Sequence, residues 1–434
     1  MEFEDQQMFL DQVAQEVVNR IALGNKISQL ADKAIARMAT NAAGRNMAEV
    51  PCQNEVAMQG QAGDATPPSP LKVGVPRKLI LRSKLSPGDI LMLTAAVRDL
   101  HLTYPGQFVT DVRTPCPHLW ENNPYITSLS ANDPEVELVD CHYPLVHRSN
   151  DLPFHFIHAY RMFLNRHIGL QIQPHAFKAD IHLRNEEREW ISQVQELTGE
   201  ATRFWIIVSG GKKDFTNKIW DTARFQEVVD YFYGRITFVQ VGQEHHIHPP
   251  LKNVVNLVGK TDLRQLVRLM YHADGVICGV TMLMHLAAAV EAKPGGARNR
   301  PCVVLAGGRE PSQWEAYPHH QFLHTNGALP CCDAGGCWKS RVQPLGDGAE
   351  QDSSLCVYPV NTPDGTPLPK CMDMITSQDV IRAVERYLHF GTVSMEAAEK
   401  IRPNYNGKPV SRDHAKPKGM MRNIKNVATK VTQA

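Results

Sequence analysis

The sequence FWIIVSGGKK (residues 204–213) joins a short apolar run to a polar turn that contains two glycines. An apolar run of this length, closed by small polar residues, predicts a buried strand that ends near Ser209. Downstream, helical and strand-like stretches alternate, with helices expected over 222–233, 262–271 and 282–292 and strands over 236–241, 254–258, 275–278 and 302–306. This alternation predicts a parallel sheet with helices on both faces.

An earlier part of the chain has the same pattern. Strands are expected over 78–82, 108–112 and 136–141, and helices over 89–101, 152–168 and 185–197. We therefore expect an α/β fold with two Rossmann-like parallel-sheet domains in tandem, residues 76–200 and 201–328. Such domains leave a cleft between the carboxyl ends of their strands, where open α/β sheets bind ligands.

Composition and charge narrow the class of protein. The 434 residues are too many for one small module, and 43% hydrophobic with 21% charged residues indicates a globular chain. A net charge of +1 excludes a global attraction to nucleic acid or membranes. The longest apolar run, 275–290, is too short to span a bilayer, and the acidic start of the chain does not resemble a signal peptide. We therefore expect a cytoplasmic protein.

Five segments outside the two domains differ from them in pattern. Residues 1–56 place apolar side chains at helical spacing, which predicts a helical extension for docking or oligomerisation. Residues 57–75 have linker composition, and residues 329–372 are rich in Cys, Gly and Pro. Helical periodicity returns in residues 373–398, and residues 399–434 are a basic tail. Such tails are usually only solvated, with nucleic-acid contact as the alternative.

The first candidate for chemistry is the turn that ends in Ser86-Pro87-Gly88-Asp89, between the first strand and its helix. A carboxylate at the carboxyl end of that strand can accept a proton from a bound hydroxyl. Asp89 can equally do no more than complement the helix dipole, and the local sequence alone favours this second interpretation.

The second candidate follows the strand at 204–209. Small residues at Ser209, Gly210 and Gly211 let the backbone approach a phosphate, and lysines neutralise diphosphate charge. The lysines here are Lys212, Lys213 and Lys218. The spacing matches neither a P-loop nor a dinucleotide-binding turn, so an ordinary surface loop is the alternative.

The third candidate is the strand-to-helix junction at residues 279–285. Thr281 is placed to cap the helix, and the free N–H groups at Met282 and beyond favour an anion. His285, one turn into the helix, is either a ligand contact or a satisfied core histidine, and the local sequence favours the core.

Cysteines cluster in the second half of the chain. Six of the ten lie between residues 302 and 371, namely Cys302, Cys331, Cys332, Cys337, Cys356 and Cys371. A secreted disulfide scaffold is normally shorter and follows a signal peptide, so we expect a reducing compartment.

Together these motifs resemble a known family. In order they read K-x-S-P-G-D-I, S-G-G-K-K with a following K-x-W, V-G-Q-E, V-T-x-x-M-H-L-A-A-A and P-C-V-V-L-A-G-G-R-E-P-x-x-W. The order and spacing resemble the heptosyltransferases of glycosyltransferase family nine over about residues 76–390. The closer resemblance is to the bacterial autotransporter heptosyltransferases, which modify protein hydroxyls and carry a cysteine-bound iron.

The resemblance implies a GT-B architecture and roles for particular residues. It implies that Asp89 is the catalytic base, which reverses the local preference for capping. Lys218 corresponds to a lysine that contacts the donor phosphate, Glu244 to an acidic residue near the nucleoside, and Thr281 and His285 to the donor-binding turn. Lipopolysaccharide heptosyltransferases have D-T-G where this chain has Val280-Thr281-Met282, so that aspartate contact is missing.

The resemblance also implies a metal site. Cys332, Cys337, Cys356 and Cys371 resemble the iron-binding knuckle, and four thiolates suit a tetrahedral iron or zinc. Cys331 is an alternative to Cys332 as the first ligand. The role is structural, because four thiolates leave no open position for substrate.

The expected function is an inverting transfer of a sugar from an ADP-sugar to a hydroxyl acceptor, with no catalytic metal. Heptose is the favoured sugar. A protein acceptor is favoured over lipopolysaccharide or nucleic acid, and a homo-oligomer is possible. Two alternatives stay open: a nucleotide-sugar epimerase or hydrolase of the same fold, and a non-catalytic binding or assembly protein.

Overall fold

The structure, a computed structural model, describes residues 75–143, 150, 152, 154–190 and 192–392. All of these residues belong to one compact unit, residues 67–434. The expected N-terminal extension, nearly all of the expected linker and the basic tail lie outside the described residues.

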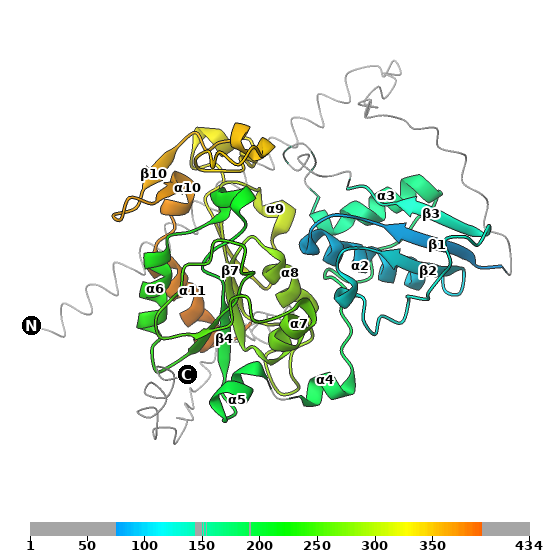
Figure 1. The fold of residues 1–434 in the computed structure, drawn as a ribbon, viewed down its shortest axis with the longest axis horizontal. Coiled ribbons are helices and arrows are strands. Elements are labelled where there is room, and N and C mark those ends of the chain that lie inside the picture. The colour runs from blue at the N-terminus through cyan, green and yellow to red at the C-terminus, as the bar shows by residue number, and fades with distance from the viewer. Residues whose placement is uncertain (1–74, 144–149, 151, 153, 191, 393–434) are drawn as a thin grey trace, which may run out of the picture. The chain divides into compact units, whose positions relative to one another are not determined.

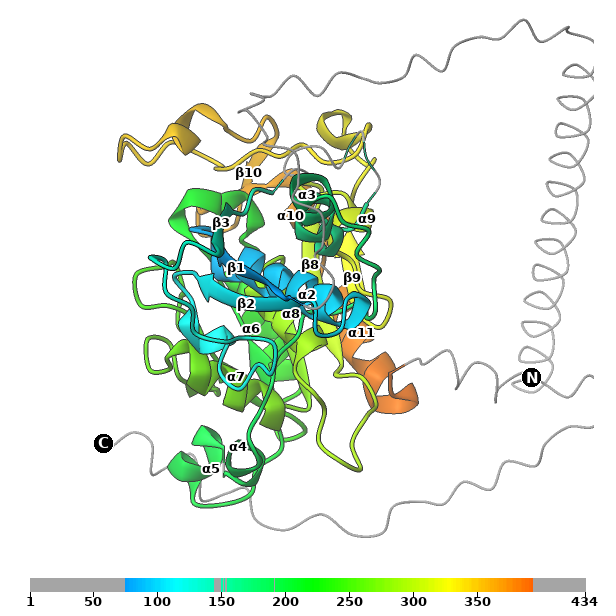
Figure 2. The same cartoon turned by 90° about the vertical axis from the view of Figure 1, so that its right-hand side faces the viewer.

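The first sheet has three parallel strands in the order β2-β1-β3. Figure 2 shows β1 between its two neighbours. Leu79, Ile80 and Leu81 at the centre of β1 are buried, as expected for a strand covered on both faces. Helix α2 begins at Pro87, where the fixed φ of proline suits a first helical position. The bounds are β1 Arg77–Arg82, α2 Pro87–Thr103, β2 Phe108–Arg113 and β3 Val136–Asp140.

The second sheet has six parallel strands in the order β6-β5-β4-β7-β8-β9. This confirms the parallel α/β sheet predicted from the alternation. The strand order reverses at β4, which has β5 on one side and β7 on the other, and ligands bind beside such reversals. The bounds are β4 Phe204–Ile207, β5 Thr237–Gln240, β6 Val255–Asn256, β7 Gly275–Gly279, β8 Cys302–Gly307 and β9 Gln321–His324.

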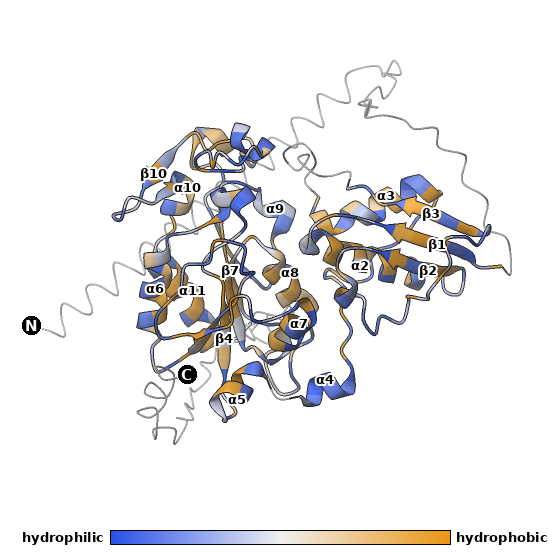
Figure 3. Ribbon diagram, in the orientation of Figure 1, coloured by the Kyte–Doolittle hydropathy of each residue, from blue (hydrophilic) through white to orange (hydrophobic). Residues whose placement is uncertain are grey.

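Alternate side chains of β4 enter two different cores. Trp205 and Ile207 pack with helices α6 and α11, which lie side by side in Figure 1, whereas Phe204 and Ile206 pack with α7 and α8. Both faces of the sheet are therefore covered, and its central strands β4, β7 and β8 are predominantly apolar (Figure 3). The helices are α6 Thr222–Tyr231, α7 Leu263–His272, α8 Met282–Ala289 and α11 Ser377–Phe390.

Two expected helices are shorter than predicted. The helix expected over 152–168 consists of a 3₁₀ turn, Phe156–His158, and α3, Ala159–Ile168, which ends at Gly169 with φ 69°. The helix expected over 185–197 is divided into α4, Asn185–Glu189, and α5, Gln193–Thr198. The division occurs because the Ser192 hydroxyl accepts a hydrogen bond from the Gln195 N–H, which starts a second helix.

The Cys-rich segment is mostly irregular, as expected. Its fully buried Arg341 pairs with Asp347 at 2.7 Å and also with Asp352, which fixes the course of the loop. No helix in the described part of the chain is long and apolar enough to cross a membrane. The remaining elements are η3 Lys213–Lys218, α9 Ser312–Glu315, 3₁₀ turns Pro117–Leu119, Pro330–Cys332 and Glu350–Ser353, β10 Pro359–Asn361, β11 Pro367–Pro369 and α10 Lys370–Asp373.

Candidate functional site

The first turns of α2 and α8 meet. A Cβ atom on Gly88 would lie 3.8 Å from the Met282 Cα and 3.8 Å from the His285 Cδ2, which is van der Waals contact. From the loop after β4, Lys212 Nζ donates a hydrogen bond to the Ser86 hydroxyl at 2.8 Å. The three sequence candidates, distant along the chain, are therefore brought together at the carboxyl ends of β1, β4 and β7.

Asp89 lies partly buried in the first turn of α2. Burial, and to a smaller degree nearby Glu315, raise its pKa, whereas Lys218, a Ser86 backbone hydrogen bond and Lys212 lower it, and the net value is about 6. A carboxylate whose pKa approaches the working pH is a stronger base than an ordinary aspartate, yet it is still mostly ionised at pH 7. The site is therefore suited to remove a proton from a bound hydroxyl.

The lysines predicted for a diphosphate differ in their surroundings. Lys218 Nζ lies 2.7 Å from the Glu310 carboxylate, and its hydrogen bond to the Val280 carbonyl places it beside the α8 junction. Lys213 is exposed at the start of η3. Glu244 is exposed in the loop after β5, against Gly259. Lys212 and Lys218 therefore lie nearest to Asp89.

The Ser209-Gly210-Gly211 turn is occupied by the chain itself. A Cβ atom on Gly210 would lie 1.7 Å from the Ile247 carbonyl oxygen, and Gly211 exchanges two 3.0 Å backbone hydrogen bonds with Ile247. The Ser209 hydroxyl donates to the Pro249 carbonyl. The glycines thus permit a close approach of the loop at 245–250, and the Gly211 N–H is already used.

The loop at 245–248 is only partly exposed to solvent. Both ring nitrogens of His248 are buried without a hydrogen-bond partner, and burial lowers its pKa to about 4. Its imidazole packs where a Cβ atom on Gly242 would approach to 2.4 Å. His248 is therefore a neutral packing residue beneath the turn.

Helix α8 begins as predicted. The Thr281 side chain accepts a hydrogen bond from the Leu283 N–H at 3.3 Å, and Met282 is the first helical residue. The His285 ring is buried, with Nδ1 2.9 Å from the Tyr317 hydroxyl, and burial lowers its pKa to about 3. His285 is therefore a neutral core histidine behind the first turn.

Sequence reasoning did not single out two buried glutamates, Glu310 and Glu315. Glu310 forms ion pairs with Lys218 and Arg309, whereas Glu315 Oε2 lies 3.0 Å from His285 Nε2. The signal that could have found them is a pair of carboxylates directly after a strand as apolar as CVVLAG, at the edge where ligands bind.

The cysteines share one neighbourhood. A Cβ atom on Gly308 would lie 3.0 Å from the Cys332 Sγ and 3.4 Å from the Cys371 Cβ, and the Cys337 N–H donates to the Gly308 carbonyl. Burial, with repulsion from Cys337, Cys332, Cys371 and Cys356, raises the pKa of Cys331 to about 12.

The arrangement of these thiols differs from the expected knuckle. Among residues 75–143, 150, 152, 154–190 and 192–392, no group of three or more His, Cys, Asp or Glu side chains is arranged to hold a metal ion. Cys332 Sγ is directed instead toward backbone carbonyls, and it donates to the Leu329 oxygen at 3.4 Å. The donor set suits a soft metal, but its geometry is not that of a closed tetrahedral site.

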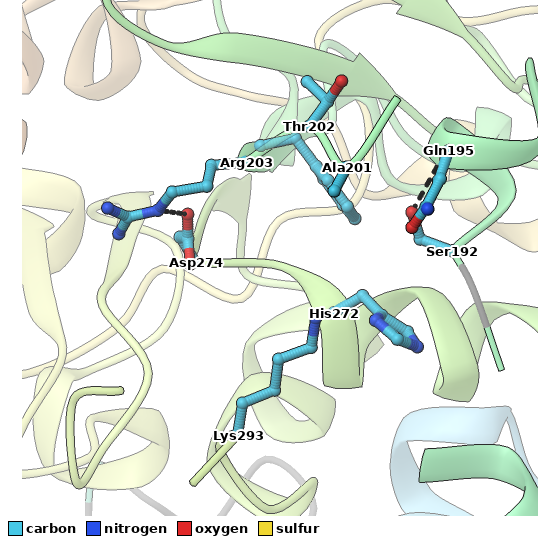
Figure 4. Close-up of a pocket in the computed structure, with 9 residues that line it drawn as sticks. Ser192, Gln195, Ala201, Thr202, Arg203, His272, Asp274 and Lys293 are labelled. Atoms are coloured by element: carbon cyan, nitrogen blue, oxygen red, sulfur yellow. Dashed lines mark hydrogen bonds and ion pairs between the residues drawn. The ribbon is translucent and has the colours of Figure 1, made fainter. Parts of the chain in front are cut away.

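A pocket lies elsewhere, at the amino ends of β4 and β7. Arg203 and Asp274 pair there at 2.8 Å, and Ser192, which caps α5, lies on the opposite side of the pocket (Figure 4). The remaining lining residues are Gln195, Ala201, Thr202, Phe204, His272 and Lys293. Because ligands of such sheets bind at the carboxyl ends, this pocket is separate from the candidate site.

One protein-family model matches part of the chain. Residues 143–331 match the model of "Glycosyltransferase family 9 (heptosyltransferase)". The match includes the candidate residues from Ser209 to His285, and it includes neither Asp89 nor Cys332. No curated protein matches the chain.

Three solved structures are similar to the chain. A glycosyl transferase of family 9 from Veillonella parvula has 15% identity over 75% of this chain and 99% of its own, with a TM-score of 0.48. The E. coli ADP-heptose lps heptosyltransferase II has 16% identity over 72% of this chain and 98% of its own, with a TM-score of 0.44. The iron-containing dodecameric glycosyltransferase TibC from enterotoxigenic E. coli has 16% identity over 74% of this chain and 78% of its own, with a TM-score of 0.48.

Proposed function

We propose that the chain is a glycosyltransferase that moves heptose from ADP-heptose to a hydroxyl group, in keeping with the match of residues 143–331 to the family 9 model. The observation that carries this proposal is the meeting of Asp89 with Lys212 and Lys218 where α2 touches α8. A base and two cations beside one junction suit an acceptor hydroxyl and a departing diphosphate.

In this proposal Asp89 accepts the proton of the acceptor hydroxyl. The acceptor oxygen forms a bond to the anomeric carbon as the bond from that carbon to the diphosphate breaks, and ADP leaves with the bonding electrons. Attack from the face opposite the diphosphate inverts the anomeric centre. Alignment of acceptor and donor beside Asp89 lowers the barrier by avoiding the entropy cost of a free encounter.

The diphosphate is stabilised by charges already in place. Lys212 and Lys218, with Lys213 at the start of η3, supply cations, and the N–H groups at Thr281 and Met282 point from the start of α8. Fixed charges of this kind stabilise a leaving anion without reorganisation. Glu244, in the loop after β5, would contact the nucleoside.

The direct test is incubation of the full-length chain with ADP-heptose or a UDP-sugar and a cell lysate. Of the two donors, we expect only ADP-heptose to add a heptose mass to a protein of the lysate, which intact-mass spectrometry detects. A heptose label on lipopolysaccharide or nucleic acid instead would identify one of these as the acceptor. Sugar release without an acceptor would support the epimerase or hydrolase alternative, and failure to bind any ADP-sugar would support a non-catalytic protein.

The rate is expected to depend on pH through Asp89. Its pKa of about 6 means that the base is protonated, and inactive, below that value. The ratio kcat/KM should therefore fall about tenfold per pH unit below pH 6 and level off above it. Initial rates between pH 4.5 and 7.5 measure this, and a flat profile over that interval would remove Asp89 from the role of base.

We also propose a structural iron or zinc on Cys332, Cys337, Cys356 and Cys371, supported by the shared neighbourhood of these thiols and their soft donor chemistry. Metal binding would require the Cys332 thiol to leave its backbone acceptors. No step of the transfer passes through this metal.

Metal analysis of the purified chain should find about one ion per chain, and Cys332→Ser and Cys371→Ser should lose it. Cys116→Ser, at a buried free cysteine of the first sheet region, is the matched control and should keep it. Equal metal content in all four proteins would contradict this assignment.

A further inference from the structure

The two buried glutamates after β8 have opposite surroundings. The Oε1 atom of Glu310 forms ion pairs with two cations, the Lys218 Nζ at 2.7 Å and the Arg309 guanidinium. Glu315 lies at the end of α9, and its Oε2 accepts no hydrogen bond in the part of the chain that the structure describes. Its contact there is the His285 Nε2 at 3.0 Å.

This difference separates their protonation states. A buried carboxylate without a paired cation is costly, so it keeps its proton instead. Burial, with repulsion from Glu310, raises the pKa of Glu315 to about 8. Burial alone would also raise the pKa of Glu310, but Lys218 and Arg309 lower it below its usual value. At pH 7, Glu310 is therefore ionised and Glu315 is neutral.

Glu315 lies directly behind the junction of α2 and α8. Its neighbour His285 is one turn into α8, and the His285 ring lies 3.8 Å from the Cβ position of Gly88, the residue before Asp89. A charge on Glu315 would therefore face the first turn of α8, with only a neutral imidazole between them.

We propose that Glu315 is a positioning residue whose bound proton permits the donor diphosphate to bind at the first turn of α8, an inference that rests on the function proposed above. Lys212, Lys218 and Arg309 supply three positive charges, and Glu310 removes one of them. Loss of the Glu315 proton adds a buried negative charge behind the turn where the anion binds. The fixed cations then outweigh the carboxylates less strongly, and the diphosphate binds more weakly.

The other groups around Glu315 do not change charge in the same interval. Burial lowers the pKa values of His155 and His285 to about 3, and it raises those of Tyr143 and Tyr317 well above the usual value. Asp89, with a pKa of about 6, is ionised throughout. Of the groups whose pKa the surroundings shift here, Glu315 alone titrates between pH 7 and 9. The groups facing it are Asp89 from α2, Tyr143 and His155 from the first sheet region, Lys218 from η3, His285 from α8, and Arg309, Glu310 and Tyr317 after β8.

The test uses ADP as the probe and calorimetry as the measurement. For the unmodified chain we expect the Kd of ADP to rise about tenfold from pH 7 to pH 9, because most Glu315 is ionised at the upper end. In Glu315→Gln, which imitates the neutral acid, the Kd should change less than about twofold. Glu385→Gln, on the surface pair with Arg235, is the matched control and should behave as the unmodified chain does.

A second measurement needs no variant. If ADP binds only the protonated form, binding at pH 9 must take up close to one proton per chain, which calorimetry in two buffers of different ionisation enthalpy detects. Zero uptake, or the same pH-dependent weakening in Glu315→Gln, would overturn the inference while leaving the proposed transferase intact. A folded chain that binds no ADP at pH 7 would instead overturn the proposed function, and this inference with it.

Discussion

Replacement of Asp89 by asparagine is expected to lower kcat by about 10²–10⁴-fold, the usual contribution of a general base. Asparagine keeps the size of the side chain, but its amide cannot take the acceptor proton. Because Lys212 and Lys218 are unchanged, the Kd of ADP should stay within about twofold of the original value. Initial rates at saturating donor and acceptor, with ADP calorimetry on the same preparation, separate the two effects.

A matched control for this variant is Asp133→Asn. Asp133 forms a partly exposed pair with Lys78 before β3, at the amino end of the first sheet, and pairs accessible to solvent contribute little to stability. Its activity should equal that of the unmodified chain. Full activity in Asp89→Asn would show that another group takes the proton, and equal loss of ADP binding and turnover would show that Asp89 serves the donor.

The parallel sheet was predictable because its signals are local. Apolar runs of strand length and amphipathic helices repeat along the chain, and Thr281 was correctly predicted as a helix cap from its neighbours alone. The divided helix at 185–198 was missed although its cause, Ser192, is also local. Sequence spacing alone treats a capping serine inside a helical pattern as a surface residue.

Those features of the site that the sequence could not show depend on distant contacts. Gly210 looked like an approach for phosphate, but its small size is required by Ile247, which the fold brings against it. The sequence did not distinguish Glu315 from other charged residues, and its burial beside His285 is visible only in the fold. Residue types and periodicity cannot reveal such pairings, because burial is a property of the whole fold.

Replacement of Arg300 by methionine is expected to lower the free energy of unfolding by about 3–5 kcal/mol, because several buried backbone carbonyls would lose their donor at a cost of about 1–3 kcal/mol each. The Arg300 side chain is buried, and it is bonded to backbone carbonyls at the carboxyl ends of two helices. The acceptors are Tyr271 and Ala273 at the end of α7, and Ala287, Val290 and Glu291 at the end of α8. A cation there also complements both helix dipoles.

Methionine would leave these carbonyls buried without donors, and each unmade bond costs more than the bond contributed. Arg300→Lys should restore only part of the lost free energy of unfolding, because the three donors of lysine cannot reproduce the planar fork of a guanidinium. Arg203→Met is the matched control: its side chain is 87% exposed in the pair with Asp274, so its denaturation midpoint should not change measurably. Urea denaturation followed by circular dichroism compares the three variants with the unmodified chain. Because α8 begins at the Thr281 cap, Arg300→Met should also weaken ADP binding at temperatures where the variant remains folded. A free energy of unfolding equal to that of the unmodified chain would contradict this prediction and would mean that water replaces the guanidinium at both helix ends.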